Sequence, residues 1–176
     1  SDLELTKGPN VDEEILETIG KCNGDLADKK PSVEQLTQIF KEHSLWLGDH
    51  LLGRRANLCG ADLAHRRVEN VSLRNAILVD TKFTGATLRN VDLTGAILIG
   101  AKFNGAILLE TNLTSTRLDN ADFSTAIFRD VKLINAFLVR TLMNSAKLFE
   151  VDLYLVNFEP SAGSLPNTED IILPAN

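Results

Sequence analysis

The chain has 176 residues, of which 44% are hydrophobic, 24% are charged and only 6% are aromatic, and its net charge is -6. This length suits one domain, and the low aromatic content predicts a core built mainly from aliphatic side chains. The sequence contains neither an apolar run long enough to span a membrane nor a basic leader followed by an apolar segment, which argues against membrane binding. Because the first residue is Ser1, localisation stays open, with the cytoplasm favoured.

The negative charge is confined to the ends of the chain. Residues 1–55 hold 11 acidic and 7 basic side chains, residues 56–159 hold 11 of each, and the remainder adds two acids. Because the middle of the chain lacks a basic stripe, direct binding to nucleic acid is not expected. The same neutrality argues against imitation of the negative charge of DNA.

Residues 1–55 are predicted to form an N-terminal segment with one or two capping helices. The shorter helix is indicated by the capping-box spacing of Asn10 and Glu13 and by the apolar residues Val11, Ile15, Leu16 and Ile19. The stronger signal starts at Ser32, three residues before Gln35, where apolar residues follow on one helix face. We expect this second helix to cover the beginning of the next domain, with a polar loop over Lys21–Lys30 between the two helices.

From Ala56 to Phe158 the chain repeats every five residues without insertion or deletion. The centre of each repeat, from position 58 to position 158, is apolar in all 21 cases, and 14 of the centres are Leu. The residue two before each centre is small or β-branched except at Arg66, and the residue two after it is Gly, Asn or Asp in 12 cases. Since those three types tolerate positive φ, they predict a corner at the end of each repeat. Four such sides would close a square coil.

The repeats resemble those of a known family. Segments such as Ala61-Asp62-Leu63, Val91-Asp92-Leu93 and Ala121-Asp122-Phe123 are similar to the AxLxx repeats of pentapeptide-repeat proteins. The resemblance implies an all-β solenoid over residues 56–160, a right-handed quadrilateral parallel β-helix of about five coils. The helices expected in residues 1–55 would form its N-terminal α-helical cap, because a solenoid needs its ends covered. Some members look like duplex DNA and protect gyrase; this chain departs from them, because its repeat is neutral and lacks loops that interrupt the coils.

A coil of four repeats sorts the side chains into four faces. Phe83, Phe103 and Phe123 then stack in one inward column. Outward apolar residues of adjacent coils form a candidate interaction patch of Ile77, Val79, Ile97 and Ile99. Such a patch either binds a partner or is covered by a terminal segment of the chain, and both interpretations stay open.

The end of the repeat offers a second candidate contact. Phe149, Tyr154 and Leu155 are outward residues of the final coils, where they would form a homodimer seam or the floor for the C-terminal tail. Residues 161–176 are expected to be a partly mobile tail, because Pro and Gly interrupt regular structure there. Ile171, Ile172 and Leu173 are nevertheless expected to dock on the last coil.

Few residues are candidates for chemistry. The two cysteines and three histidines all lie in the N-terminal part of the chain: Cys22, His43, His50, Cys59 and His65. Their spacing matches no metal motif, and no phosphate loop or nucleophile elbow is present, so we predict no catalytic residue, metal or cofactor. Cys22 and Cys59 are expected to be free thiols, with a disulfide as the alternative in an oxidising compartment. Arg66 indicates either a local distortion, with its guanidinium reaching water or an N-terminal acid, or an anion site.

The sequence therefore predicts a non-enzymatic scaffold or protein-interaction module with an unknown protein partner, and a homodimer is one form this could take. A topoisomerase-modulating protein that imitates DNA is the alternative, and an enzyme with its site in residues 1–55 is a third class.

Overall fold

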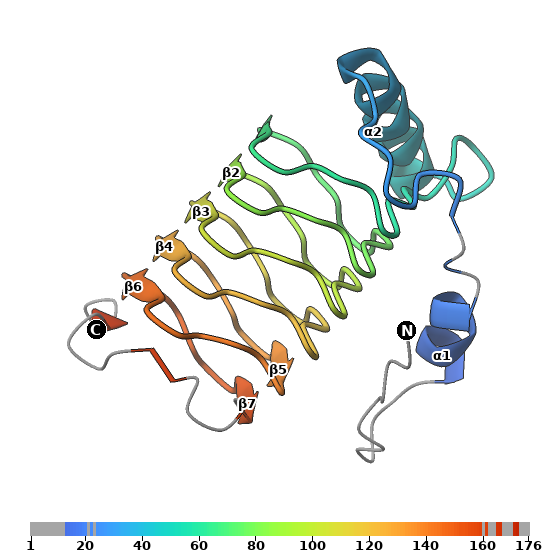
Figure 1. Ribbon diagram of the computed structural model, residues 1–176. Helices are drawn as coiled ribbons and strands as arrows, with labels where there is room; N and C mark the ends of the chain where they lie inside the picture. Colours follow the sequence, from blue (N-terminus) through green and yellow to red (C-terminus); the bar gives the residue numbers. More distant parts are fainter. Residues whose placement is uncertain are drawn as a thin grey trace.

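The computed structural model describes residues 13–20, 22, 24–159, 161, 165–166 and 171–172. Figure 1 shows a stack of similar coils with two helices near its N-terminal end. No helix in these ranges is long and apolar enough to cross a membrane. The elements are α1 (Glu13–Gly20), α2 (Val33–Gly48), β1 (Arg67–Glu69), β2 (Thr87–Arg89), β3 (Ile107–Leu109), β4 (Ile127–Arg129), β5 (Phe137–Val139), β6 (Lys147–Phe149), β7 (Asn157–Glu159) and β8 (Ile171–Ile172).

The coils are related by one constant register, in which each strand residue up to β7 pairs with the residue four repeats away along the chain, whereas β8 pairs with β6 outside this register. Strands β1, β2, β3, β4, β6 and β8 form one parallel sheet, in which Val68 pairs with Leu88 and Leu88 with Leu108. Isolated parallel bridges repeat the same shift on the other sides, for example between Asn57 and Ile77. The predicted four-sided parallel β-helix of about five coils is thereby confirmed.

We number the four faces by the centres of their repeats. Face 1 contains the centres from Leu58 to Phe158, face 2 those from Leu63 to Met143, face 3 those from Val68 to Leu148, and face 4 those from Leu73 to Leu153, each at every fourth repeat. Strands β1 to β4 and β6 run along face 3, whereas β5 and β7 belong to face 1.

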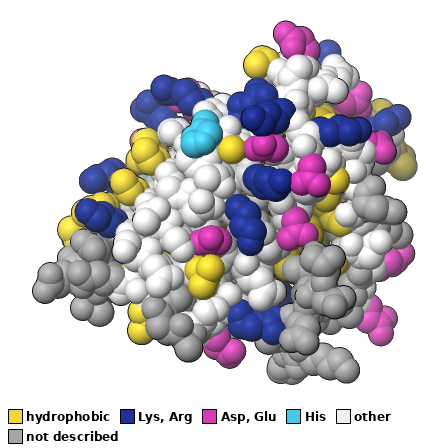
Figure 2. Space-filling view, in the orientation of Figure 1, with side chains coloured by type: hydrophobic (Ala, Val, Ile, Leu, Met, Phe, Trp, Pro, Cys, Tyr) yellow, Lys and Arg dark blue, Asp and Glu magenta, His cyan; other side chains and the backbone are white. Residues whose placement is uncertain are grey.

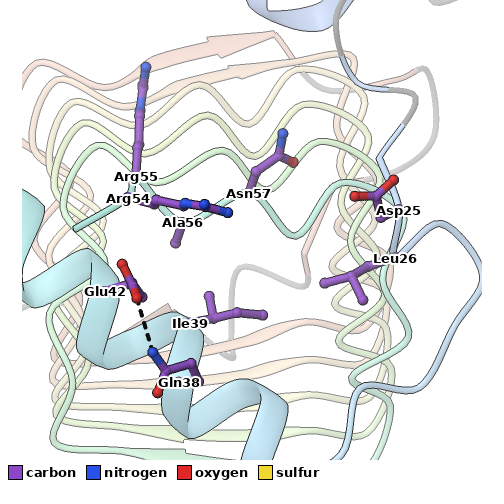
Figure 3. A pocket seen from close by; sticks show the side chains of 9 residues that line it. All are labelled: Asp25, Leu26, Gln38, Ile39, Glu42, Arg54, Arg55, Ala56 and Asn57. Carbon is purple, nitrogen blue, oxygen red and sulfur yellow. Dashed lines mark hydrogen bonds between the residues drawn. The ribbon is translucent and has the colours of Figure 1, made fainter.

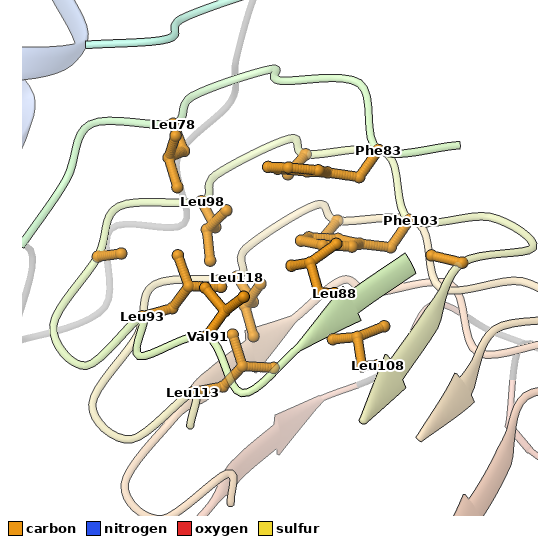
Figure 4. Close-up of a cluster of buried hydrophobic side chains, with 14 of the residues drawn as sticks. Leu78, Phe83, Leu88, Val91, Leu93, Leu98, Phe103, Leu108, Leu113 and Leu118 are labelled. Atoms are coloured by element: carbon orange, nitrogen blue, oxygen red, sulfur yellow. The ribbon is translucent and has the colours of Figure 1, made fainter. Parts of the chain in front are cut away.

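The inward side chains fill the bore of the coil. Phe83, Phe103 and Phe123 stack with adjacent ring centroids 4.9 Å apart, as predicted, and leucines of the other faces surround them (Figure 4). These rings are at most 1% exposed. Thr81 occupies one of the small positions and satisfies its buried hydroxyl by donating to the Leu58 carbonyl at 2.8 Å. Large and small residues thus alternate to close a thin core.

The corners share one backbone conformation. All 20 corner residues from Gly60 to Leu155 have φ between 48° and 71°. Eight of them are neither Gly, Asn nor Asp: His65, Glu110, Ser115, Thr125, Arg140, Ser145, Glu150 and Leu155. The repeat therefore imposes the left-handed conformation even on side chains that disfavour it.

Helix α2 closes the N-terminal end of the stack (Figure 1). It starts with the predicted capping box, in which Ser32 Oγ accepts from the Gln35 amide at 3.1 Å and Gln35 Oε1 accepts from the Ser32 amide at 2.8 Å. Leu36 enters the core, and Ile39 and Phe40 pack against the core cluster. The end of the first coil is therefore covered by an apolar helix face, as a solenoid requires.

Helix α1 lies beside the flank of the stack (Figure 1). Its expected cap Asn10 and the neighbouring Val11 lie outside the described residues, as do the side chains of Ile15 and Leu16. At the other end of the chain, Ile171 and Ile172 pair with Leu148 and Phe149 of β6, as expected. Leu173 lies outside the described residues.

Candidate interaction surfaces

The apolar patch on face 1 is covered by the N-terminal segment. Ile19 of α1 and Cys22 pack against a buried cluster formed by Cys59, Val79, Ile97 and Ile99, with Ile77 at its edge. Val79, Ile97 and Ile99 are at most 5% exposed. Of the two interpretations of this patch, cover by a terminal segment agrees with the structure. We call α1 together with Cys22 the cover.

Face 1 stays buried where its apolar column is interrupted. Arg117 and Asp119 replace the aliphatic residues in the next coil and form a two-bond ion pair, Nε to Oδ2 at 2.9 Å and Nη2 to Oδ1 at 3.1 Å. The Arg117 guanidinium also lies 4.6 Å from the centroid of the Phe137 ring. Both charges are buried, and the paired geometry offsets part of their desolvation.

Cys22 and Cys59 form a disulfide between the cover and the first coil. The expectation of free thiols is therefore wrong. The residues are 37 positions apart, and their Cα atoms are brought to 5.7 Å by the path of the intervening chain. Two backbone hydrogen bonds fix that path: the Asp28 amide donates to the Gly60 carbonyl at 2.9 Å, and the Asp62 amide donates to the Lys29 carbonyl at 2.8 Å. Sequence spacing contains no information about this path.

His43 of α2 links the cap to the first two coils. Its ring is fully buried; Nδ1 accepts from the Ala56 amide at 3.0 Å, and Nε2 lies 3.0 Å from the Arg74 carbonyl. Since Nδ1 accepts, Nε2 carries the proton and donates to Arg74. Burial lowers the pKa of His43, the charge of Arg55 lowers it further, and the bond to the Arg74 carbonyl opposes both. The sequence singled out this residue without predicting its role.

Arg66 anchors the N-terminal segment instead of distorting the coil. Its Nη2 donates to the Pro31 carbonyl at 2.6 Å, so its partner is a carbonyl and not the acid that the sequence suggested. The coil keeps its register, because the Thr87 amide still donates to the Arg66 carbonyl at 2.9 Å. The predicted local distortion is therefore wrong, and the guanidinium already has a partner within the chain.

A cavity of about 350 Å³ lies between α2, the loop before it and the first coil (Figure 3). Two of its polar side chains have partners within the chain: Gln38 Nε2 donates to Glu42 Oε1 at 3.0 Å, and Arg55 Nε donates to the Asn75 carbonyl at 2.6 Å. Arg55 also lies over the ring of Trp46. The cavity is lined by residues of mixed charge and polarity: Asp25, Leu26, Gln38, Ile39, Glu42, Arg54, Arg55, Ala56 and Asn57.

The C-terminal end of the stack is more open. Tyr154 and Leu155 are 66% and 60% exposed, and Phe158, the last centre of face 1, is 39% exposed. Phe149 does not join them: it lies on face 3, half-buried, with the Arg129 guanidinium 4.6 Å from its ring centroid. Beside the last coil is an apolar cavity of about 100 Å³, lined by Leu133, Leu138, Met143, Leu148, Leu153, Val156, Phe158 and Pro166.

Comparison with known proteins agrees with this geometry. A family profile described as pentapeptide repeats matches residues 54–90 and 88–124, with 8 copies, and the coils continue beyond it in the same register to β7. The coiled region of this chain is built of pentapeptide repeats. A search of curated proteins found no match.

Several solved structures of other proteins are similar to this chain. One is a pentapeptide repeat protein from the thylakoid lumen of Arabidopsis thaliana, 27% identical over 51% of this chain, with a TM-score of 0.43. QnrB1, a plasmid-mediated fluoroquinolone resistance protein, is 15% identical over 65% of this chain, with a TM-score of 0.41. This chain spans 66% and 63% of those two chains. Rfr23 of the cyanobacterium Cyanothece 51142 is 23% identical, with a TM-score of 0.32; the match covers 62% of this chain and 90% of Rfr23.

The face of the molecule shown in Figure 2 carries interspersed charges of both signs. Among the described residues, no group of three or more His, Cys, Asp or Glu side chains could hold a metal ion. Exposed ion pairs such as Lys82 with Asp28 join the loop before α2 to face 2 at 2.7 Å. The described charged groups at this junction thus take part in holding the N-terminal segment.

Proposed function

We propose that this pentapeptide-repeat protein is a non-enzymatic binding module that holds a protein partner at the C-terminal end of its β-helix. The observation that carries the proposal is the set of large apolar side chains exposed at this end: Leu142, Tyr154, Leu155, Phe158, Leu165 and Ile172. Exposed apolar area of this kind is typical of protein interfaces, and tyrosine is enriched among the residues that contribute most binding energy.

The rest of the molecule supports this assignment. The bore of the middle coils is filled, Leu36 of α2 enters the core at the N-terminal end, and the apolar patch of face 1 lies under the cover. The cavity at the C-terminal end has only apolar walls, which suits the side chain of a protein partner better than a polar substrate.

The test uses the purified chain in light scattering and in chemical cross-linking with native extract. Tyr154→Asp and Leu155→Asp should abolish the complex, whether the partner is a second copy or another protein. Val33→Asp is the matched control, because Val33 is 65% exposed at the opposite end and an acid is favourable in the first turn of α2. Equal binding by all variants would contradict the proposal, and strong inhibition of gyrase supercoiling would favour the topoisomerase alternative.

We further propose that the protein works in an oxidising compartment, in place of the cytoplasm that the sequence favoured. The Cys22–Cys59 disulfide supports this location, because such bonds are rare where glutathione and thioredoxin keep thiols reduced. Trapping of thiols in intact cells should recover the oxidised form; a fully reduced form would contradict the proposal.

A further inference from the structure

Three features meet at Cys59 on face 1. Its sulfur is bonded to Cys22, its side chain is only 2% exposed, and it belongs to the apolar cluster that Ile19 and Cys22 cover. The disulfide therefore lies at the contact between the cover and the apolar face. Cys22 is half-buried, so it is the more accessible residue of the two.

The chain on the C-terminal side of the cover is anchored independently of the disulfide. Asp28 and Lys29 form backbone hydrogen bonds with the first coil, Lys82 pairs with Asp28, and Arg66 donates to the Pro31 carbonyl. These contacts lie within or beyond the turn at residues 25–28. Breaking the disulfide therefore leaves the loop before α2, and α2 itself, attached to the β-helix.

Unlike the loop before α2, the cover depends on the disulfide to stay attached to the β-helix. Helix α1 has only two turns, Glu13–Gly20, which is too short for an isolated helix to be stable in water, so it needs tertiary contacts to stay folded. The cross-link holds these contacts at high effective concentration. Without it, the contacts of α1 with face 1, among them the packing of Ile19 on the cluster of Val79, Ile97 and Ile99, must hold the helix without a cross-link.

We propose that the Cys22–Cys59 disulfide is a site for a dithiol reductant, and that its reduction releases α1 and exposes the apolar patch of face 1. A thiolate of the reductant attacks Cys22 Sγ and forms a mixed disulfide, and Cys59 leaves as a thiolate. The second thiol of the reductant then displaces Cys22 and leaves the reductant oxidised as an intramolecular disulfide. The two protons given up by the reductant convert the released thiolates to thiols. The oxidised protein is the closed form and the reduced protein the open form.

This inference is independent of the proposed binding at the C-terminal end, because it concerns face 1; it shares the Cys22–Cys59 disulfide with the proposed location. The patch it exposes consists of Ile77, Val79, Ile97 and Ile99, which are continuous across two coils. The redox state of one bond would then decide whether this face is available.

The first test measures the reactivity of Cys59 in the full chain. Wild-type protein is reduced with dithiothreitol without denaturant and exposed to a maleimide, and Cys59 labelling is followed by peptide mass spectrometry. We expect Cys59 of the reduced protein to react within a few-fold of its rate in urea. If α1 stayed in place on face 1 after reduction, Cys59 would react at least tenfold more slowly. Hydrogen exchange should show at least tenfold faster exchange in α1, with unchanged exchange in α2 and β2 to β4.

Two controls separate local release from general unfolding. The only tryptophan of the chain, Trp46, lies in α2, so its emission should not change on reduction. Cys22→Ser should label at Cys59 and exchange in α1 like reduced wild type, with or without dithiothreitol. An unreactive Cys59 with a protected α1 in reduced protein would overturn the proposal. Faster exchange throughout the coils would also overturn it, because the disulfide would then be a general cross-link.

Discussion

The first ten corners of the β-helix and the last ten share one backbone conformation but differ in sequence. From Gly60 to Gly105, nine of ten are Gly, Asn or Asp, whereas from Glu110 to Leu155 only Asn120, Asp130 and Asn135 are. A left-handed conformation costs other residues roughly 1–2 kcal/mol each. The C-terminal half therefore adopts the same coil at a higher local cost, which shows that the apolar centres and the hydrogen bonds between coils determine the fold.

The two ends of the β-helix also differ, because the N-terminal end is better covered than the C-terminal end. The N-terminal end is closed by α2, with Leu36 in the core and His43 bonded to the first coils. At the C-terminal end, Phe158 is partly exposed beside an apolar cavity. Because terminal coils of a solenoid contact a neighbour on one side only, stability should decrease toward the less covered end.

The largest predicted effect separates the middle of the core from its C-terminal end. Phe103→Ala should lower the free energy of unfolding by about 3–5 kcal/mol, because it removes a fully buried ring from the stack. Phe158→Ala should cost about 1 kcal/mol, since that ring is partly exposed. Urea unfolding followed by circular dichroism measures both. Equal losses would show that the C-terminal end is as tightly packed as the middle.

A second prediction concerns pH and the capped end. Burial holds the pKa of His43 below its ordinary value of 6.5, so the unfolded chain takes up the proton first as pH falls. The free energy of unfolding should therefore decrease below about pH 6.5, by at most about 1.4 kcal/mol per pH unit from this residue. Urea unfolding between pH 7.5 and pH 5 measures the slope.

Two variants isolate the contribution of His43. His43→Gln should be less stable at neutral pH and should show a smaller slope, because one titrating group is removed from the cap. His50→Gln makes the same exchange at an exposed histidine and serves as the control. An unchanged slope in His43→Gln would mean that other groups cause the pH dependence.

The smallest predicted effect tests the corners. Thr125 has φ of 61°, and Asn tolerates this conformation better, so Thr125→Asn should raise the free energy of unfolding by about 0.5–1 kcal/mol. Thr114→Asn makes the same exchange outside the corners and should give no gain. A Thr125 variant without increased stability in calorimetry would show that the C-terminal corners are not strained.

The repeat was predictable because the same residue types recur at the same spacing in every coil. The unbroken centres, Phe83 through Phe123 in one column, and the capping box at Ser32 all follow from residue types at fixed spacing. The corners were predicted in number, but the sequence could not show that Thr125 and Leu155 adopt the same φ as the glycines. Their conformation is imposed by neighbouring coils, a tertiary effect.

The contacts of the N-terminal segment could not be predicted. That the patch at Ile97 is covered, that Cys22 reaches Cys59, and that Arg66 binds the Pro31 carbonyl all depend on the path of residues 22–31 over the first coil. Hydrogen bonds of Asp28 and Lys29 to backbone atoms fix that path, and backbone partners have no sequence signature.

The constant register between coils also limits how the length of this protein can change. Removal of four consecutive repeats, such as residues 91–110, would delete one coil and return every later residue to its own face. Removal of a single repeat would rotate all later coils by a quarter turn. Outward charged residues of another face would then stack on outward positions that now have apolar neighbours. Length variants of this chain should therefore be tolerated in whole coils, and the distance between its two ends should change in steps of about 4.8 Å.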